Sequence, residues 1–277
     1  MVQANGLRFR TMVDGPASGD LFVLLHGFPE GAESWSMQVD ALAKAGALAV
    51  APDMRGYGLT DAPDRVEDYA MTNLVADVAG LVEAFGRDRA HIAGHDWGAL
   101  VAWSFALAHP EMTASLTALS VGHPAALAAA MRDDDQRARS SYIALFLMEG
   151  KSEHVLAEDG YRRLRAMLEP AIPTTVVDHF ARSLSRPGRL TAALNYYRAN
   201  LSPDSTWTGL RTDRHVEAST TLLWGDQDPA LGRAQAEGTA RYVSGEYRLE
   251  VLAGAGHWLQ FERPDEVARS LTQALSK

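Results

Sequence analysis

The chain of 277 residues contains no cysteine. This absence excludes disulfide bonds, catalysis by a thiol and metal sites built from thiolates. The sequence also lacks any apolar run close to the roughly 18–20 residues of a membrane-spanning helix, and its first ten residues lack the apolar stretch of a secretory signal. We therefore expect a soluble, cytoplasmic protein that does not enter a membrane.

Positive charge is also in short supply. The 26 Lys and Arg residues are outnumbered by 35 Asp and Glu residues, which gives a net charge of −9. The basic residues are scattered along the chain, whereas a nucleic-acid partner requires a basic face, so we expect no such partner. Hydrophobic residues make up 47% of the chain, which is enough for one large domain or for a core with an insertion.

Short apolar runs alternate with helix-patterned segments in the first 121 residues. The predicted strands are Leu7–Val13, Leu21–Leu25, Ala47–Ala51, His91–Ala93 and Leu116–Val121. The predicted helices are Ser34–Ala45, Asn73–Phe85 and Ala99–Ala108. Buried strands that alternate with amphipathic helices indicate an α/β fold, in which helices cover both faces of a mostly parallel central sheet.

The alternation stops near residue 125 and resumes after residue 210. The intervening segment has helical patterns, no convincing strand and several prolines. The later part predicts strands over Thr220–Trp224 and Tyr247–Leu252 and helices over Leu231–Val243 and Asp265–Leu275. We therefore predict a core formed by residues 1–124 and 211–277. An all-helical cap over residues 125–210 is expected to cover the C-terminal edge of the sheet, where open α/β folds bind ligands.

The stretch Ala90–Leu100 is the most informative about chemistry. A short apolar strand leads into Gly94-His95-Asp96-Trp97-Gly98, and a helix of small residues follows. Glycines two residues before and two after the central position are typical of the nucleophile elbow, a sharp turn at which only glycine leaves room for the crowded backbone. Asp96 stands where the G-x-S-x-G form has serine. A carboxylate can displace at an sp³ carbon and become an ester, although a structural Asp at a helix N-terminus also fits the pattern.

A nucleophile of this kind needs a base, an acid that orients the base and an oxyanion site. His257 is the candidate base, because it lies in a glycine-rich loop directly after the last predicted strand. The acid should follow an earlier strand, and two aspartates, Asp226 and Asp228, follow Thr220–Trp224. We favour Asp228, which precedes a proline on the crest of the loop, and interpret Asp226 as a turn-former.

The oxyanion site should be formed by backbone N–H groups. One is predicted to come from Trp97, the residue after the nucleophile. The other is predicted to come from Phe28 in the loop His26–Glu30, because Pro29 has no N–H to donate.

Four further polar residues follow predicted strands but suit structural roles. We interpret His26 and His123 as histidines that brace turns through their ring nitrogens, since both are flanked by glycine and proline. We interpret Asp53 and Arg55 as scaffolding of the loop in which they lie.

Together these motifs resemble the α/β-hydrolase superfamily and, within it, the soluble epoxide hydrolases, over nearly the whole chain. The matching segments are His26-Gly27-Phe28-Pro29-Glu30, Asp53–Gly58, Gly94-His95-Asp96-Trp97-Gly98, Val121-Gly122-His123-Pro124, Gly225–Asp228 and His257. The resemblance implies an α/β-hydrolase fold and hydrolysis of a small, largely apolar epoxide to a vicinal diol. It implies no metal or organic cofactor, and it is compatible with a homodimer.

The same family uses two cap tyrosines whose hydroxyls hold and protonate the epoxide oxygen. Ser141–Phe146 is similar to the first of these sites and Leu194–Arg198 to the second. The resemblance therefore implies this role for Tyr142 and Tyr197. Tyr196 lies about 100° away from Tyr197 on the same helix, and we interpret it as a packing residue.

Two dehalogenase families share the aspartate elbow. Haloalkane dehalogenases commonly carry Asn, which helps to hold the halide, where this chain has Phe28. Fluoroacetate-type dehalogenases carry Arg, which grips the substrate carboxylate, where this chain has Trp97. These departures favour epoxide hydrolysis over haloalkane or haloacid dehalogenation. A non-catalytic protein that binds a small molecule stays an alternative, because a fold does not prove a function.

Overall fold

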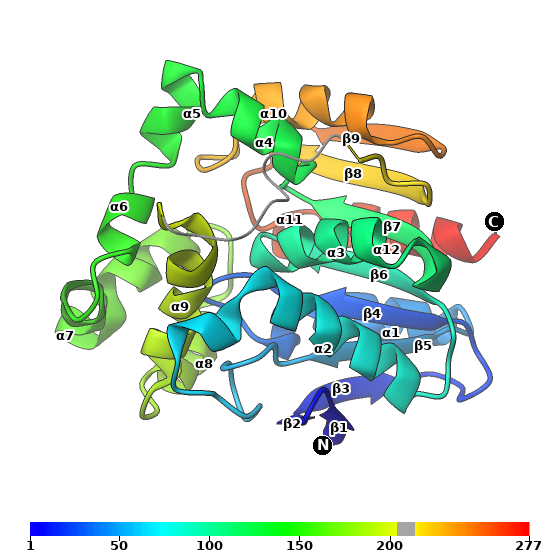
Figure 1. Ribbon diagram of the computed structural model, residues 1–277, viewed down its shortest axis with the longest axis horizontal. Coiled ribbons are helices and arrows are strands. Elements are labelled where there is room, and N and C mark those ends of the chain that lie inside the picture. Colours follow the sequence, from blue (N-terminus) through cyan, green and yellow to red (C-terminus); the bar gives the residue numbers. More distant parts are fainter. Residues whose placement is uncertain (204–213, 277) are drawn as a thin grey trace.

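The computed structural model describes residues 1–203 and 214–276, and a seven-stranded sheet lies at its centre (Figure 1). The strand order is β3-β5-β4-β6-β7-β8-β9. The strands are β3 (Thr11–Asp14), β4 (Leu21–Leu25), β5 (Leu48–Pro52), β6 (Ala90–His95), β7 (Thr113–Leu119), β8 (Ser219–Gly225) and β9 (Tyr247–Leu252). Only the β3–β5 pair is antiparallel among the ladders of this sheet in the described residues. The predicted mostly parallel sheet is confirmed.

Helices pack on both faces of the sheet. One face carries α2 (Met71–Ala84) and α3 (Trp97–Ala108), and the other carries α1 (Ser36–Lys44) and α12 (Pro264–Gln273) (Figure 1). Alternate side chains of β4 enter the two cores that result: Leu21, Val23 and Leu25 enter the first, and Phe22 and Leu24 enter the second. A strand that is buried on both sides needs apolar residues at every position, which explains its continuous apolar run.

The described residues between β7 and β8 contain helices and no strand. These helices are α4 (Pro124–Ala130), α5 (Asp134–Arg139), α6 (Ile143–Phe146), α7 (Lys151–Leu168), α8 (Thr174–Leu184) and α9 (Arg189–Leu201). Helix α7 is interrupted by non-helical backbone at residues 158–161. Helices α5 to α9 gather at one end of the sheet, at the left of Figure 1, whereas α4 lies beside α10 (Arg233–Gly238). The division into core and cap stays a prediction, and its second boundary, at residues 210 and 211, lies outside the described residues.

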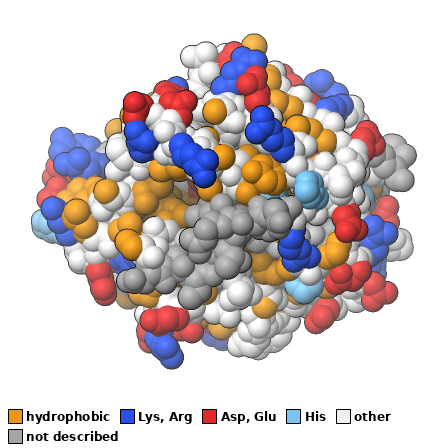
Figure 2. All heavy atoms as spheres, turned by 45° about the horizontal axis from the view of Figure 1, so that its top comes forward, with side chains coloured by type: hydrophobic (Ala, Val, Ile, Leu, Met, Phe, Trp, Pro, Cys, Tyr) orange, Lys and Arg blue, Asp and Glu red, His pale blue; other side chains and the backbone are white. Residues whose placement is uncertain are grey.

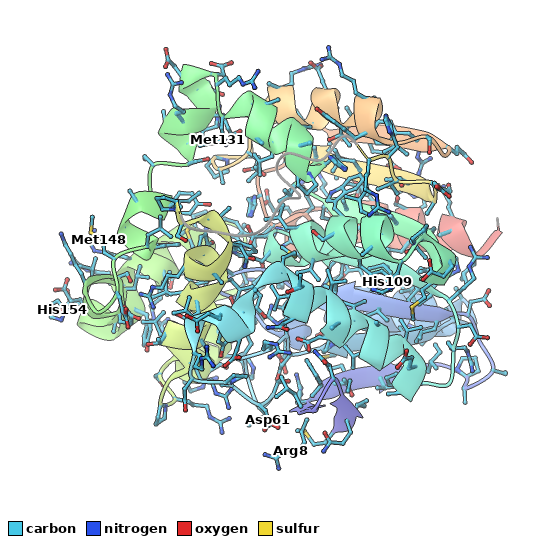
Figure 3. All side chains as sticks on the ribbon, in the orientation of Figure 1. Arg8, Asp61, His109, Met131, Met148 and His154 are labelled. Atoms are coloured by element: carbon cyan, nitrogen blue, oxygen red, sulfur yellow. The ribbon has the colours of Figure 1, made fainter. Side chains whose placement is uncertain are left out.

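The N-terminal strand prediction was wrong in detail. Instead of one strand over Leu7–Val13, the chain forms a hairpin of β1 (Val2–Ala4) and β2 (Leu7–Phe9), and then β3. Asn5 and Gly6 form the turn with φ values of 44° and 75°, a conformation that an Asn-Gly pair favours. An ion pair between Arg8 and Asp61 then holds β2 to the loop after β5 (Figure 3).

The predicted helix Leu231–Val243 is also shorter than expected. It divides into α10 and a 3₁₀ helix, η5 (Thr239–Tyr242). Leu231 stays outside the helix, and its N–H donates to the carboxylate of Asp228, 2.9 Å away. The first residues of the predicted helix therefore belong to the loop that carries this aspartate.

The described part of the chain holds no helix that is both long and apolar enough to cross a membrane. On the face shown in Figure 2, acidic and basic side chains are interspersed with hydrophobic ones.

Candidate active site

Asp96 lies in the sharp turn between β6 and α3, with φ 52° and ψ −118°. Three glycines make this turn possible. A Cβ atom on Gly94 would overlap the carbonyl oxygen of Gly98, one on Gly98 would overlap the carbonyl oxygen of Leu25, and one on Gly27 would overlap Asp96 itself. The predicted elbow and its need for glycine are confirmed.

The elbow allows a direct test of this crowding. Gly98→Ala is expected to lower the free energy of unfolding by about 2 kcal/mol or more, since the new methyl group must displace backbone atoms. Gly238→Ala is the matched control: a Cβ there would meet only Ala126, at 3.5 Å, so the change should be neutral or stabilising. Urea unfolding measures both, and equal stability of the two variants would contradict the packing account.

Asp96, His257 and Asp228 converge from three separate loops. His257 lies between β9 and α11 (Leu259–Glu262), and Asp228 follows β8. His257 Nδ1 is 2.8 Å from Asp228 Oδ2, and His257 Nε2 is 3.7 Å from Asp96 Oδ2. His257 and Asp228 are buried, whereas 14% of the Asp96 side chain remains exposed. The imidazole of His257 thus lies between the buried carboxylate of Asp228 and the partly exposed carboxylate of Asp96.

The two candidate acids make different contacts. Asp228 Oδ1 accepts the N–H groups of Ala230 and Leu231 at 2.8 and 2.9 Å, which leaves Oδ2 for His257. The exposed Asp226 instead accepts the N–H of Gly254 at 2.8 Å and joins the loops after β8 and β9. Asp228 is therefore the aspartate that the structure places against the imidazole.

This difference predicts unequal effects of the same substitution. Asp228→Asn presents an amide to His257 and favours the wrong tautomer, so kcat is expected to fall by about 10²–10⁴-fold. Asp226→Asn keeps the acceptor oxygen that Gly254 uses, so its kcat should stay within about threefold of the parent. Steady-state kinetics on one epoxide distinguishes the two, and a larger loss in the Asp226 variant would contradict the assignment.

Charge in the site is arranged as an ion pair. Burial alone would lower the pKa of His257, but the nearby Asp228 and Asp96 raise it well above its usual value. Burial alone would raise the pKa of Asp96, but His257, His95 and the Phe28 N–H lower it. Asp96 is therefore ionised near neutral pH, as a nucleophilic carboxylate must be.

The two predicted oxyanion donors reach Asp96 from different segments, since Phe28 lies in the loop after β4 and Trp97 directly follows Asp96 in the chain. The Phe28 N–H donates to Asp96 Oδ1 at 2.9 Å. Trp97 is the first residue of α3, so its N–H has no carbonyl partner within the helix. The structure confirms that Phe28 contacts the carboxylate, whereas the role of either N–H group in a reaction stays a prediction.

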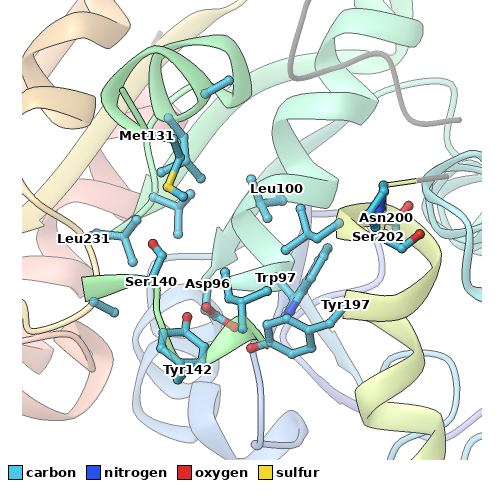
Figure 4. A pocket seen from close by; sticks show the side chains of 17 residues that line it. Asp96, Trp97, Leu100, Met131, Ser140, Tyr142, Tyr197, Asn200, Ser202 and Leu231 are labelled. Atoms are coloured by element: carbon cyan, nitrogen blue, oxygen red, sulfur yellow. The ribbon is translucent and has the colours of Figure 1, made fainter. Parts of the chain in front are cut away.

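A cavity of about 390 Å³ opens onto Asp96 (Figure 4). Its lining is mostly apolar: Trp97, Leu100, Val121, Leu127, Ala128, Met131, Ser140, Tyr142, Ile143, Tyr197, Asn200, Leu201, Ser202, Pro203, Ala230 and Leu231 join Asp96. Asp96 is the only charged residue among those that line it in the described chain. Such a cavity fits a small uncharged ligand better than an ionic one.

Tyr142 and Tyr197 face this cavity from the start of α6 and from α9, with ring centroids 6.5 Å apart. Burial, together with the neighbouring charge of Asp96, raises the pKa of both hydroxyls. The whole Tyr142 residue is 36% exposed, whereas Tyr197 is buried. Both phenols are therefore protonated donors at neutral pH.

Tyr196 is fully buried and turned away from the cavity. Its hydroxyl donates to the carbonyl oxygen of Arg55 at 2.8 Å, and its ring lies against Tyr57 and Trp97. This confirms that Tyr196 packs, and it shows how α9 is held against the core so that Tyr197 faces Asp96.

A buried polar cluster behind the elbow was missed from the sequence. The ring nitrogens of His95 lie 2.8 Å from Glu30 Oε1 and 2.9 Å from the carbonyl oxygen of His257, and Gln260 donates to Glu30. The Ser120 hydroxyl donates to the same His257 carbonyl at 2.7 Å. Glu30 and His95 lie inside the two motifs already singled out, so polar side chains next to buried strands were the signal that the sequence offered. The cluster holds the backbone of His257.

His26 and His123 brace turns, as predicted. His26 accepts the Met54 N–H at 3.0 Å through Nε2, and its Nδ1 lies 2.9 Å from the Gly27 carbonyl oxygen. His123 Nδ1 accepts the Ala125 N–H at 3.2 Å and so caps α4. Burial lowers the pKa of His26, and that of His123 to about 4, so both are neutral.

Asp53 and Arg55 are scaffold residues, as predicted, but they have separate partners. Asp53 accepts the N–H groups of Ala32 and Leu59 at 3.0 and 3.1 Å. Arg55 forms a two-bond ion pair with Asp77, at 2.8 and 2.6 Å.

Within residues 1–203 and 214–276, no group of three or more His, Asp or Glu side chains could hold a metal ion.

Comparison with known proteins agrees with this geometry. The family model for the α/β hydrolase fold matches residues 20–264. Epoxide hydrolase A of Mycobacterium tuberculosis is 34% identical, and the alignment covers 100% of this chain and 96% of that protein. Epoxide hydrolase 3 of Xenopus tropicalis is also 34% identical, over 99% of this chain and 76% of the relative.

A solved structure shows the same fold. The crystal structure of Epoxide Hydrolase A from Mycobacterium thermoresistibile superposes with a TM-score of 0.89 at 34% identity, and covers 99% of this chain and 97% of that one. The full-length matches in sequence and structure extend the resemblance beyond the local motifs. The chain therefore belongs to the α/β-hydrolase superfamily and, within it, is an enzyme of the epoxide hydrolase family.

Proposed function

We propose that this chain hydrolyses epoxides to vicinal diols through a covalent ester on Asp96. The observation that carries the proposal is one apolar cavity lined by an ionised carboxylate and two protonated phenols. An epoxide needs both at once, because its carbon must be attacked while its oxygen is stabilised as a developing alkoxide. The names of the relatives, which are epoxide hydrolases, support the same reaction.

In the first step, Tyr142 and Tyr197 donate hydrogen bonds to the epoxide oxygen while Asp96 attacks a ring carbon. The new bond joins the carboxylate oxygen to that carbon, and the bond from the carbon to the epoxide oxygen breaks. One phenol transfers its proton to the alkoxide. A phenol with an ordinary pKa near ~10 is a suitable donor, because an alkoxide is far more basic. The product is a hydroxyalkyl ester of Asp96.

Ester formation also prepares the second step. Asp96 is one of the two carboxylates that raise the pKa of His257, and the ester carries no charge. The pKa of His257 therefore falls once the ester has formed, and the imidazole can lose its proton and act as a base. The surviving contact to Asp228 at 2.8 Å keeps Nε2 directed at the ester.

In the second step, His257 removes a proton from water, and the resulting hydroxide attacks the ester carbonyl carbon. The N–H groups of Phe28 and Trp97 stabilise the oxyanion. Collapse breaks the bond to the diol oxygen, which takes up the proton held by His257. Collapse leaves Asp96 as the carboxylic acid, which loses its proton to solvent and returns as a carboxylate. Solvent returns one proton to the tyrosinate, so that one water is added to the epoxide overall.

The function is tested with a panel of aryl, alkyl and cyclic epoxides beside haloalkanes and haloacids. We expect diol from at least one class of epoxide and no halide release. Halide release without diol would instead favour a dehalogenase, and tight binding without turnover would favour a non-catalytic binding protein.

Replacing tyrosines by phenylalanine tests the hydroxyl groups alone, because the rings and their packing are kept. Tyr142→Phe combined with Tyr197→Phe is expected to slow alkylation of Asp96 by about 10²–10⁴-fold, because no acid remains for the epoxide oxygen. Tyr196→Phe, which loses only the hydrogen bond to Arg55, is the matched control and should change this rate by less than about threefold. Single-turnover kinetics measures alkylation, and an unchanged rate in the double variant would remove the phenols from the mechanism.

A further inference from the structure

Ser140, the residue directly after α5, faces the cavity two positions before Tyr142 (Figure 4). Its Oγ accepts a hydrogen bond from Gln136 Nε2 at 2.9 Å. Gln136 is 2% exposed and Ser140 is half-buried, so this bond is partly shielded from water. The direction of the bond decides what the Ser140 hydroxyl can offer to a ligand.

The Gln136 amide cannot be turned around. Its Nε2 also donates to the carbonyl oxygen of Ala230 at 2.8 Å, and its Oε1 accepts the N–H of Gly232 at 2.8 Å. A backbone carbonyl only accepts and a backbone N–H only donates. Exchanging the amide oxygen and nitrogen would therefore place two acceptors together at Ala230 and two donors together at Gly232. Nε2 must therefore face Ser140, and the serine oxygen must accept.

The hydroxyl hydrogen of Ser140 is then available to the cavity. No hydrogen bond in the described part of the chain uses it as a donor. Asn200 lies on the opposite side of the cavity (Figure 4), and its amide is already occupied because it bonds to the backbone of Met71, Tyr69 and Tyr196. Ser140 thus presents an oriented donor in a wall that is otherwise mainly aliphatic.

We propose that Ser140 forms a polar subsite that donates a hydrogen bond to an oxygen acceptor on the non-reacting arm of the substrate. The favoured substrates are then epoxides whose arm carries an ether, carbonyl or hydroxyl oxygen, in preference to hydrocarbon epoxides of equal length. The inference rests on the proposed function and adds the class of substrate. A hydrocarbon arm would leave the donor unpaired in an apolar cavity, which disfavours its binding.

The test uses pairs of terminal epoxides that differ only by replacement of one CH₂ with an ether oxygen, placed one to four atoms from the epoxide ring. For the parent enzyme, kcat/KM is expected to be about three- to tenfold higher for the ether than for the hydrocarbon at one of these positions. Ser140→Ala should bring this ratio to about one, whereas Ser140→Thr, which keeps a hydroxyl, should retain it. Ser141→Ala changes an exposed neighbouring serine and is the matched control, with an unchanged ratio.

A second variant changes the direction of the serine hydroxyl and leaves the serine in place. Gln136→Glu removes the donor, so the Ser140 hydroxyl turns to the new carboxylate and away from the cavity. The ether-to-hydrocarbon ratio should then fall to about one, even if a less firmly held acid loop lowers both rates. A general loss of structure would lower kcat/KM for the ether and for the hydrocarbon alike and would leave their ratio unchanged. A fall in the ratio therefore reports the Ser140 hydroxyl.

Two outcomes would overturn the subsite. One is a parent ratio near one at every oxygen position, and the other is a parent preference that survives in both Ser140→Ala and Gln136→Glu. In either case the chain still hydrolyses epoxides, and the proposed function stands. If neither member of any pair yields diol, the proposed function itself fails, and the subsite fails with it.

Discussion

Asp96→Asn is expected to lower kcat for epoxide hydrolysis by about 10⁴-fold or more. The amide is a poor nucleophile at carbon, and it also gives up the negative charge that pairs with His257 at 3.7 Å. The fold should persist, because Asn can still accept the Phe28 N–H. Diol formation measures the loss, and thermal unfolding serves as the control for folding.

Isotope labelling provides a second measurement of the same role. In ¹⁸O-water, the proposed water attacks the ester carbonyl, so one label should enter the Asp96 carboxylate in a single turnover and the first diol should contain none. Mass spectrometry of the peptide that holds Asp96 reads the label. Label in the first diol and none in the peptide would show that water attacks the epoxide directly, and the ester mechanism would have to be abandoned.

His257→Gln is expected to lower kcat by about 10³-fold or more. Each enzyme molecule should react with one epoxide and then stay as the ester. Alkylation needs Asp96 and the two tyrosines, so the ester should still form, whereas its hydrolysis lacks a base. Intact-protein mass spectrometry should therefore show the mass of one added substrate. An unmodified mass after incubation with an epoxide that the parent hydrolyses would contradict the two-step scheme.

The pH dependence of the two steps should differ. The pKa of Asp96 lies below its usual value, so the nucleophile is ionised throughout the neutral range and alkylation should not depend on pH there. Hydrolysis of the ester requires neutral His257, and Asp228 still raises the pKa of that imidazole. Ester hydrolysis should therefore slow as pH falls, and the ester should accumulate in the parent enzyme at low pH. Rapid quenching at a series of pH values would show this, and a pH-independent ester level would contradict it.

The elbow and the three loops around it were predictable because each depends on local rules. Glycine at positions 94 and 98 is required by atoms a few residues away or on the adjacent strand, so the spacing in the sequence carries the information. His257 and the pair of aspartates follow strands that are parallel, and the C-terminal ends of parallel strands meet at one edge. The short apolar runs showed which strands are buried on both faces.

Other features depend on which side chains meet across long separations. The sequence offered two aspartates after β8, and only the contact between His257 and Asp228, 29 positions apart, distinguishes them. Glu30 and His95 were inside recognised motifs, but their pairing behind His257 requires three loops to be in place. Gln136 and Gly232 are 96 positions apart, so no local pattern signals the amide that orients Ser140.

The type of fold and the candidate nucleophile and base followed from residue types at fixed spacings, because steric crowding at a turn and the alternation of buried elements act over short stretches of chain. The choice of acid, the cluster behind the imidazole and the polar wall of the cavity depended on the folded arrangement. Hydrogen bonds are short and directional, so which groups pair is settled only when distant segments have been packed together.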